Sequence, residues 1–166
     1  MAAYFPDCAA ATARTTPSKV ADITTLRRQI LEFRIDKTGA PYPFSMRLAD
    51  EQDWSIEFAQ QAIEEYKRFI FLAAVCDHPI TPSFVVDEVW HTHLIFTRSY
   101  WEELGDIVGK LIHHDPGQGE PGDEAVFANQ YLKTLESYRK HFGEPPADVW
   151  GPENRKNVIA KGRKAL

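Results

Sequence analysis

A long helical repeat between about residues 51 and 76 constrains the fold more than any other feature of the chain. Polar residues such as Glu57, Glu64 and Lys67 occupy one face. Apolar side chains recur on the other face at alternating spacings of three and four: Ile56, Ala59, Ile63, Tyr66, Ile70 and Ala73. That period predicts one amphipathic helix. From Phe69 to Cys76 the sequence is apolar on all sides, so we expect this end to lie in the middle of the fold.

Four shorter helices are predicted around this one, each from a capping residue followed by apolar residues at helical spacing. They are expected to begin near Asp22, Thr81, Thr97 and Asp123, because Asp and Thr side chains accept hydrogen bonds from the free backbone N–H groups of a helix start. No segment alternates apolar and polar residues as a half-buried strand does. The sequence therefore predicts an all-α fold, an irregular orthogonal bundle of about five helices.

The length of 166 residues fits a single domain, since single domains centre near about 100–150 residues. We expect a flexible N-terminal arm over residues 1–20, one helical domain over residues 21–152 and a basic C-terminal tail over residues 153–166. Within the domain, the proline-rich residues 144–152 predict an extended arm that Trp150 anchors on the body.

Charge and cysteine content narrow the classes of partner and compartment. The net charge is −5 although residues 153–166 hold five basic residues and one acidic residue, so the rest of the chain is strongly acidic. That balance argues against broad nucleic-acid binding. The longest apolar stretch is shorter than the roughly 20 residues that span a membrane. The two cysteines show no CxxC spacing, so we expect a cytoplasmic protein.

The stretch from Val85 to Asp115 concentrates the candidate chemistry, because it holds four of the six histidines. On a helix that turns by about 100° per residue, His91 falls beside Asp87, one turn later. His93 falls about 160° away from His91, inside the apolar arc of Val86, Val89 and Trp90. One continuous helix therefore cannot direct both histidines at one ion.

Asp87 and His91 form an i, i+4 pair that suits two metal ligands or a plain carboxylate–imidazole contact at the surface. A second set of donors, His114 and Asp115, follows on a loop about one short helix further along the chain. Three or four nitrogen and oxygen ligands from a helix and a loop suit a divalent metal, either zinc or iron. We predict the metal ligands Asp87, His91, His114 and Asp115.

His93 has two interpretations. A buried imidazole needs a hydrogen-bond partner, which Asp115 or a backbone carbonyl of the neighbouring loop would supply as a structural clasp. Alternatively, His93 forms the floor of a pocket, where desolvation shifts its pKa. It would then be the catalytic residue, a proton carrier behind the metal.

Two functions follow from these residues. The first is a small metal-dependent enzyme with hydrolytic or oxygen-using chemistry on a small molecule or peptide. The second is a non-catalytic module that binds a protein partner and uses the histidine cluster to fix its own structure. No GxSxG, HExxH, P-loop or GxGxxG motif is present, so the mechanisms that depend on those motifs have no support.

The segment VDEVWHTHLIFTRSYWEELGDIVGKLIHHDP resembles the signature of the glycine-rich domain-containing-protein-like family. The matching residues are Trp90, His91, His93, Tyr100, His114 and Asp115, and the likeness covers about residues 20–152. The resemblance implies a fold and a residue set but no reaction. Plant members carry long glycine-rich extensions with a candidate RNA-binding motif. This chain shows no such extension, so the resemblance does not lead us to expect RNA binding.

Overall fold

The computed structural model describes residues 22–115 and 120–152 and confirms the all-α class. Among these residues there is no strand. The chain forms α1 (Ile23–Glu32), α2 (Phe44–Gln52), α3 (Ile56–Val75), α4 (Phe84–Leu94), the π-helix η1 (Arg98–Leu104), α5 (Gly105–Val108), α6 (Asp123–Phe142) and α7 (Ala147–Trp150). The arm predicted over residues 1–20 and the tail predicted over residues 153–166 lie outside the described residues. None of the described helices is long and apolar enough to cross a membrane.

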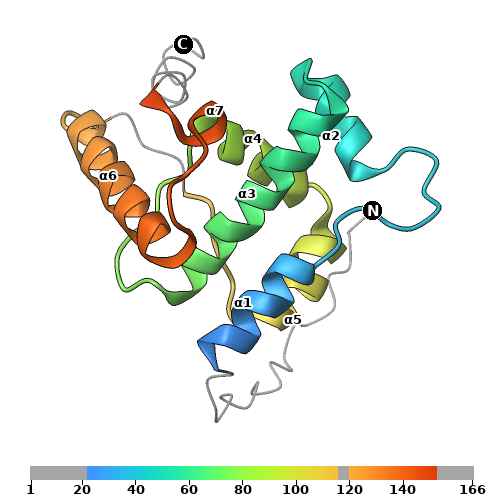
Figure 1. Cartoon of the computed structure of the whole chain (residues 1–166), viewed down its shortest axis with the longest axis horizontal. Coiled ribbons are helices and arrows are strands. Elements are labelled where there is room, and N and C mark those ends of the chain that lie inside the picture. The colour runs from blue at the N-terminus through green and yellow to red at the C-terminus, as the bar shows by residue number, and fades with distance from the viewer. Residues whose placement is uncertain (1–21, 116–119, 153–166) are drawn as a thin grey trace, which may run out of the picture.

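Helix α3 runs through the middle of the molecule and packs against α1, α2, α4 and α6 (Figure 1). Its second half was predicted to be central because it is apolar on all sides, and the side chains from Phe69 to Leu72 are fully buried. Helix α4 makes the most extensive contact with α3. The body of the protein therefore holds α4 firmly along one side, which gives its polar edge a fixed orientation.

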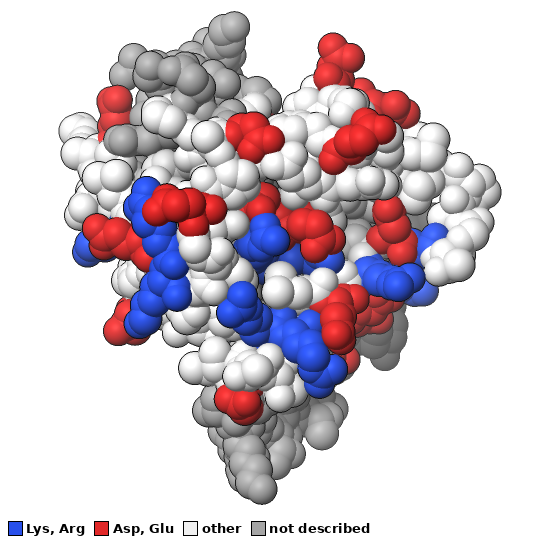
Figure 2. Space-filling model, viewed as in Figure 1, with Lys and Arg blue, Asp and Glu red and all other residues white. Residues whose placement is uncertain are grey.

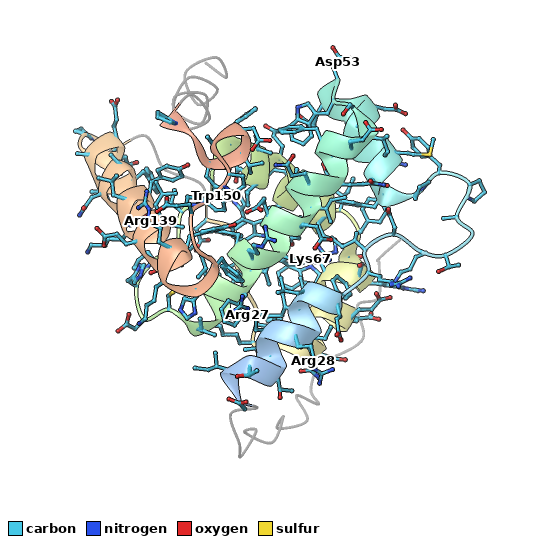
Figure 3. All side chains as sticks on the ribbon, in the orientation of Figure 1. Arg27, Arg28, Asp53, Lys67, Arg139 and Trp150 are labelled. Carbon is cyan, nitrogen blue, oxygen red and sulfur yellow. The ribbon has the colours of Figure 1, made fainter. Side chains whose placement is uncertain are left out.

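The helix predicted over about residues 51–76 begins only at Ile56 in the structure, and the helix before it, α2, was not predicted. Asp53 takes a left-handed backbone conformation at φ 57° and ends α2, at the outer tip of that helix (Figure 3). The Ser55 side chain then accepts a hydrogen bond from the Phe58 backbone N–H and begins α3. The predicted apolar repeat starts at Ile56 and lies entirely within α3, so it gave no information about the residues before it.

Two other boundaries also differ from the sequence-based expectation. Asp22 lies at the start of α1, but its side chain makes no capping bond; its backbone carbonyl accepts the first hydrogen bonds instead. Helix α4 begins at Phe84, and its capping residue is Ser83, whose hydroxyl accepts from the Val86 backbone N–H, and not Thr81. Helix α6 begins at Asp123 as predicted, although Gly122 is its N-cap and no side chain caps it, and Gly143 follows its last residue.

The C-terminal segment is anchored on the body by Trp150, as predicted, although part of it is the short helix α7 and not an extended arm. The indole nitrogen donates to the buried Glu65 carboxylate of α3 at 2.8 Å. Tyr138 of α6 donates to the same carboxylate at 2.7 Å. Trp150 lies between α6 and α3 in Figure 3, so one buried acid joins three helices.

Candidate metal centre

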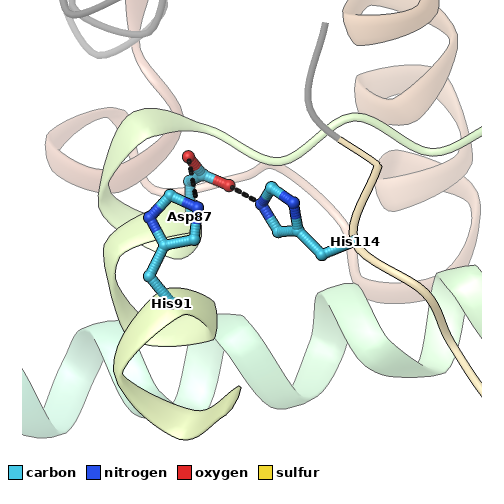
Figure 4. Close-up of side chains that lie close together, drawn as sticks. All are labelled: Asp87, His91 and His114. Atoms are coloured by element: carbon cyan, nitrogen blue, oxygen red, sulfur yellow. Dashed lines mark hydrogen bonds and ion pairs between the residues drawn. The ribbon is translucent and has the colours of Figure 1, made fainter. Parts of the chain in front are cut away.

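The polar edge of α4 meets the loop of residues 111–115 at a cluster of three side chains. Asp87 lies in the first turn of α4 and His91 lies one turn later. His114 comes from the loop and reaches the Asp87 carboxylate, with 2.9 Å between Nε2 and Oδ1. His91 Nε2 lies 3.8 Å from the other carboxylate oxygen, Oδ2. Figure 4 shows the two imidazoles on either side of the carboxylate, so the loop folds back onto α4 as expected.

The three side chains fit a metal ion geometrically. One ligand atom from each lies within 4.8 Å of the others. Three such atoms all lie within about 2.8 Å of one point, and zinc bonds to nitrogen and oxygen measure about 2.0–2.2 Å. Each ligand atom would therefore have to move toward an ion by less than about 1 Å. Three protein ligands also leave at least one coordination position open.

The cluster lies at the surface but is partly shielded. The side chains of Asp87 and His114 are each 16% exposed, whereas that of His91 is 49% exposed. The Trp90 ring lies 4.5 Å from the His114 ring, centre to centre, and covers it from the core side. An ion bound here would therefore have protein on one side and solvent on the His91 side.

The hydrogen bond that His114 donates to the Asp87 carboxylate raises the pKa of His114, and burial opposes this effect without cancelling it. In the metal-free protein this imidazole therefore holds a proton more readily than a free histidine does. A metal needs the neutral imidazole as its ligand. Metal binding at this cluster would consequently release a proton and weaken as the pH falls.

His93 lies on the opposite side of α4, as the helical spacing predicted. Its ring is fully buried, with Nδ1 2.9 Å from the Tyr66 hydroxyl and Nε2 3.0 Å from the Ser99 hydroxyl. Burial lowers the pKa of His93 to about 4, so the ring is neutral near pH 7. One nitrogen then donates and the other accepts, which satisfies the ring completely.

The partners of His93 therefore differ from the predicted ones, since neither Asp115 nor the backbone of its loop bonds to the ring. Its surroundings are aromatic, formed by Phe33, Phe44, Tyr66 and Tyr100. The geometry matches the structural interpretation of His93, as a clasp between α3, α4 and η1. A catalytic role for His93 stays a prediction.

Asp115 and His113 lie beside the cluster in sequence but not in contact with it. Asp115 is exposed and is not among the three residues whose ligand atoms converge. It adds negative charge near His114, which favours the protonated imidazole. His113 is exposed, and its ring packs 5.9 Å from that of Trp101. The structure thus brings together Asp87, His91 and His114 and leaves Asp115 at the margin.

Two residues of the π-helix η1 complete the region. Ser99 contacts His93, and the Tyr100 hydroxyl accepts from the Trp90 indole N–H at 2.9 Å. Tyr100 stands in the sequence as an aromatic residue at a family position. Nothing in the sequence indicated the π-helix, whose backbone hydrogen bonds are one residue longer than those of an α-helix. Ser99 carried no sequence signal at all.

Comparison with known proteins gives two plant relatives. Glycine-rich domain-containing protein 1 of Arabidopsis thaliana is 26% identical over 106 residues, which cover 61% of this chain and 13% of that protein. Glycine-rich domain-containing protein 2 of the same plant is 22% identical over 169 aligned residues, 90% of this chain and 21% of that protein. The chain thus spans only a small part of the curated relatives it matches. No family model and no solved structure matches the sequence.

Proposed function

We propose that this chain, whose homologues support a glycine-rich domain-containing-protein-like family, is a metal-dependent enzyme. Asp87, His91 and His114 hold a divalent ion, zinc or iron, and the substrate is a small molecule or a peptide. The observation that carries this proposal is the convergence of three ligand atoms within 4.8 Å from a helix and a distant loop. When bound, such an ion polarises a carbonyl or activates water, or supports oxygen chemistry if it is iron.

The exposure of the ligands supports a reactive site more than a closed structural one. Structural zinc sites have four protein ligands and no open position. Here three protein ligands converge, and the His91 side chain faces solvent. A substrate group can approach from that side without any change in the packing of α4. The Asp87 carboxylate also orients His114, so the ligand set is held in place before an ion arrives.

A non-catalytic role is the second candidate, and one observation favours it. The Asp87–His114 contact at 2.9 Å is already a good hydrogen bond without any ion. It joins residues 27 positions apart and fixes the loop on α4. A module that presents this loop to a protein partner would need the contact but no metal.

The surface charge of the described residues bears on the choice of partner. On the face in Figure 2, basic side chains lie among acidic ones. Arg28, Lys67 and Arg139 each form an ion pair with a neighbouring glutamate. On this face acidic side chains interrupt the described basic ones, unlike the continuous basic stripe of nucleic-acid-binding proteins. This supports a small-molecule, peptide or protein partner over a nucleic acid.

The test is metal binding by the protein and by one variant. Protein purified without added metal is assayed by elemental analysis and then titrated with zinc and, anaerobically, with Fe(II). We expect one ion per chain, and we expect Asp87→Asn to weaken zinc binding at least about 100-fold, because an anionic ligand is lost. Asp106→Asn, which removes an exposed acid on α5, is the control and should bind as wild type.

Binding and catalysis are then separated. The zinc-loaded protein is assayed with a panel of chromogenic esters and amides, and the iron-loaded protein for oxygen consumption with a small-molecule and peptide panel. Turnover that Asp87→Asn abolishes supports the enzyme. Stoichiometric binding without turnover on either panel favours the non-catalytic role, and absence of binding rules out the metal centre.

A further inference from the structure

We infer that Tyr100 is a positioning residue for the metal centre, because its hydroxyl fixes the loop that carries His114. The inference rests on the proposed function and adds to it the residue that sets the metal affinity of that site. Tyr100 lies in η1, outside the ligand set, and its side chain is 4% exposed.

The Tyr100 hydroxyl connects two groups that both act on His114. It accepts from the Trp90 indole N–H at 2.9 Å and donates to the Ile112 backbone carbonyl at 2.5 Å. The hydroxyl therefore donates its single proton to the loop backbone. Burial raises the pKa of Tyr100, so the hydroxyl keeps this proton and the bond persists at neutral and moderately alkaline pH.

Both bonds lead to the same imidazole. Ile112 is two residues before His114, in a loop without helical hydrogen bonds. Among the described residues, the bond from Tyr100 is the one that ties the backbone of residues 111–115 to the helical body. Trp90, held by the other bond, packs its ring on the His114 ring at 4.5 Å. Loss of the hydroxyl would therefore loosen His114 from its backbone side and from its ring side.

The neighbouring residue offers a matched control. Ser99 is also buried in η1, and its hydroxyl bonds to His93, away from the cluster. Ser99→Ala and Tyr100→Phe each remove one buried hydroxyl from the same π-helix and leave the rest of the packing in place. Both should lower stability, so a difference between them in metal binding reports positioning and not a general loss of structure.

The experiment measures zinc affinity, by competition with a chromogenic chelator, and amide hydrogen exchange over residues 111–114 in the metal-free protein. We expect Tyr100→Phe to weaken zinc binding about 10-fold, the lower end of effects seen when a partner of a ligand is removed. It should also speed exchange in the loop. Ser99→Ala should change both by less than about two-fold. In a His114→Ala background, Tyr100→Phe should have no further effect on zinc affinity.

The outcomes separate this inference from the proposed function. If wild type binds no zinc but Tyr100→Phe still frees the loop, the metal centre and the role of Tyr100 in metal affinity are both wrong, and the hydroxyl only holds the loop that carries His114. If Tyr100→Phe matches Ser99→Ala in zinc affinity and in loop exchange, the inference is overturned. Should Tyr100→Phe not fold, an ester in place of the amide between Ile112 and His113 decides, because an ester carbonyl at Ile112 accepts the Tyr100 hydrogen bond more weakly than an amide carbonyl does. Unchanged loop exchange in that variant also overturns the inference.

Discussion

The two faces of α4 each carry a histidine, and the surroundings of the two histidines are opposite in kind. His91 and His93 are two residues apart, yet the first is half exposed beside a carboxylate and the second is fully buried between two hydroxyls. Burial lowers the pKa of His93, whereas at the exposed edge the Asp87 hydrogen bond raises that of His114. In this W-H-x-H motif, one histidine therefore holds the core together and the other belongs to the candidate metal centre. We expect that each histidine can be changed without altering the role of the other.

The largest effect is expected on the buried face. His93→Ala leaves a cavity and two buried hydroxyls, those of Tyr66 and Ser99, without their partner. We expect a loss of about 4 kcal/mol in the free energy of unfolding. This is measured by urea denaturation. His91→Ala, on the exposed face, is the control and should stay within about 0.5 kcal/mol of wild type. A loss for His93→Ala no larger than that of the control would show that the buried and exposed faces of α4 contribute equally to stability.

Stability should depend on pH through the same residue. The unfolded chain binds a proton at His93 near the ordinary pKa of about 6.5, whereas the folded protein binds it only near 4. The contribution of His93 to stability is therefore complete above pH 6.5 and falls toward pH 4, by up to about 3 kcal/mol. The raised pKa of His114 has the opposite effect. Its contribution to stability is complete below pH 6.5 and is lost as the pH rises above that value.

The measurement is a series of urea denaturations between pH 4 and pH 7, on wild type and on His93→Gln. An amide keeps a donor and an acceptor but does not titrate, so the variant should show the shallower slope. Equal slopes in the two proteins would assign the pH dependence to other groups, such as His141, whose pKa burial also lowers.

On the exposed face the expected effect is on metal and not on stability. His91→Ala should weaken zinc binding about 100-fold, or about 2.7 kcal/mol, since it removes one of three ligands. Calorimetric titration with zinc measures this, and His78→Ala is the matched control, because His78 is bonded to Ser137 and lies outside the cluster. Similar zinc affinities for the two variants would show that His91 is no ligand.

The smallest effect is expected at Asp115. Its carboxylate is exposed and outside the converging set, so Asp115→Asn should change zinc affinity less than about three-fold and stability by less than about 0.5 kcal/mol. The same titration and denaturation experiments apply. A drop in affinity as large as that of His91→Ala would instead make Asp115 a fourth ligand, as the sequence suggested.

Helical periodicity predicted the class of the fold and the directions of His91 and His93, because both depend on local geometry that the sequence repeats. The return of His114 to Asp87 was a hypothesis that no local pattern could establish, since it depends on how η1 and the following loop turn the chain. The break at Asp53 and the hydroxyl partners of His93 were not predictable in the same way. They arise from a single left-handed residue and from contacts between segments far apart in the sequence.

The buried carboxylate of Glu65 also has a consequence for the order in which the chain can assemble. Its donors Tyr138 and Trp150 are synthesised 73 and 85 residues later. Until they arrive, the carboxylate has its ion pair with Arg68 of the same helix but lacks both donors to its second oxygen, and burying an acid with hydrogen bonds unmade is costly. The central helix should therefore settle into its final packing only after nearly all of the described chain has left the ribosome.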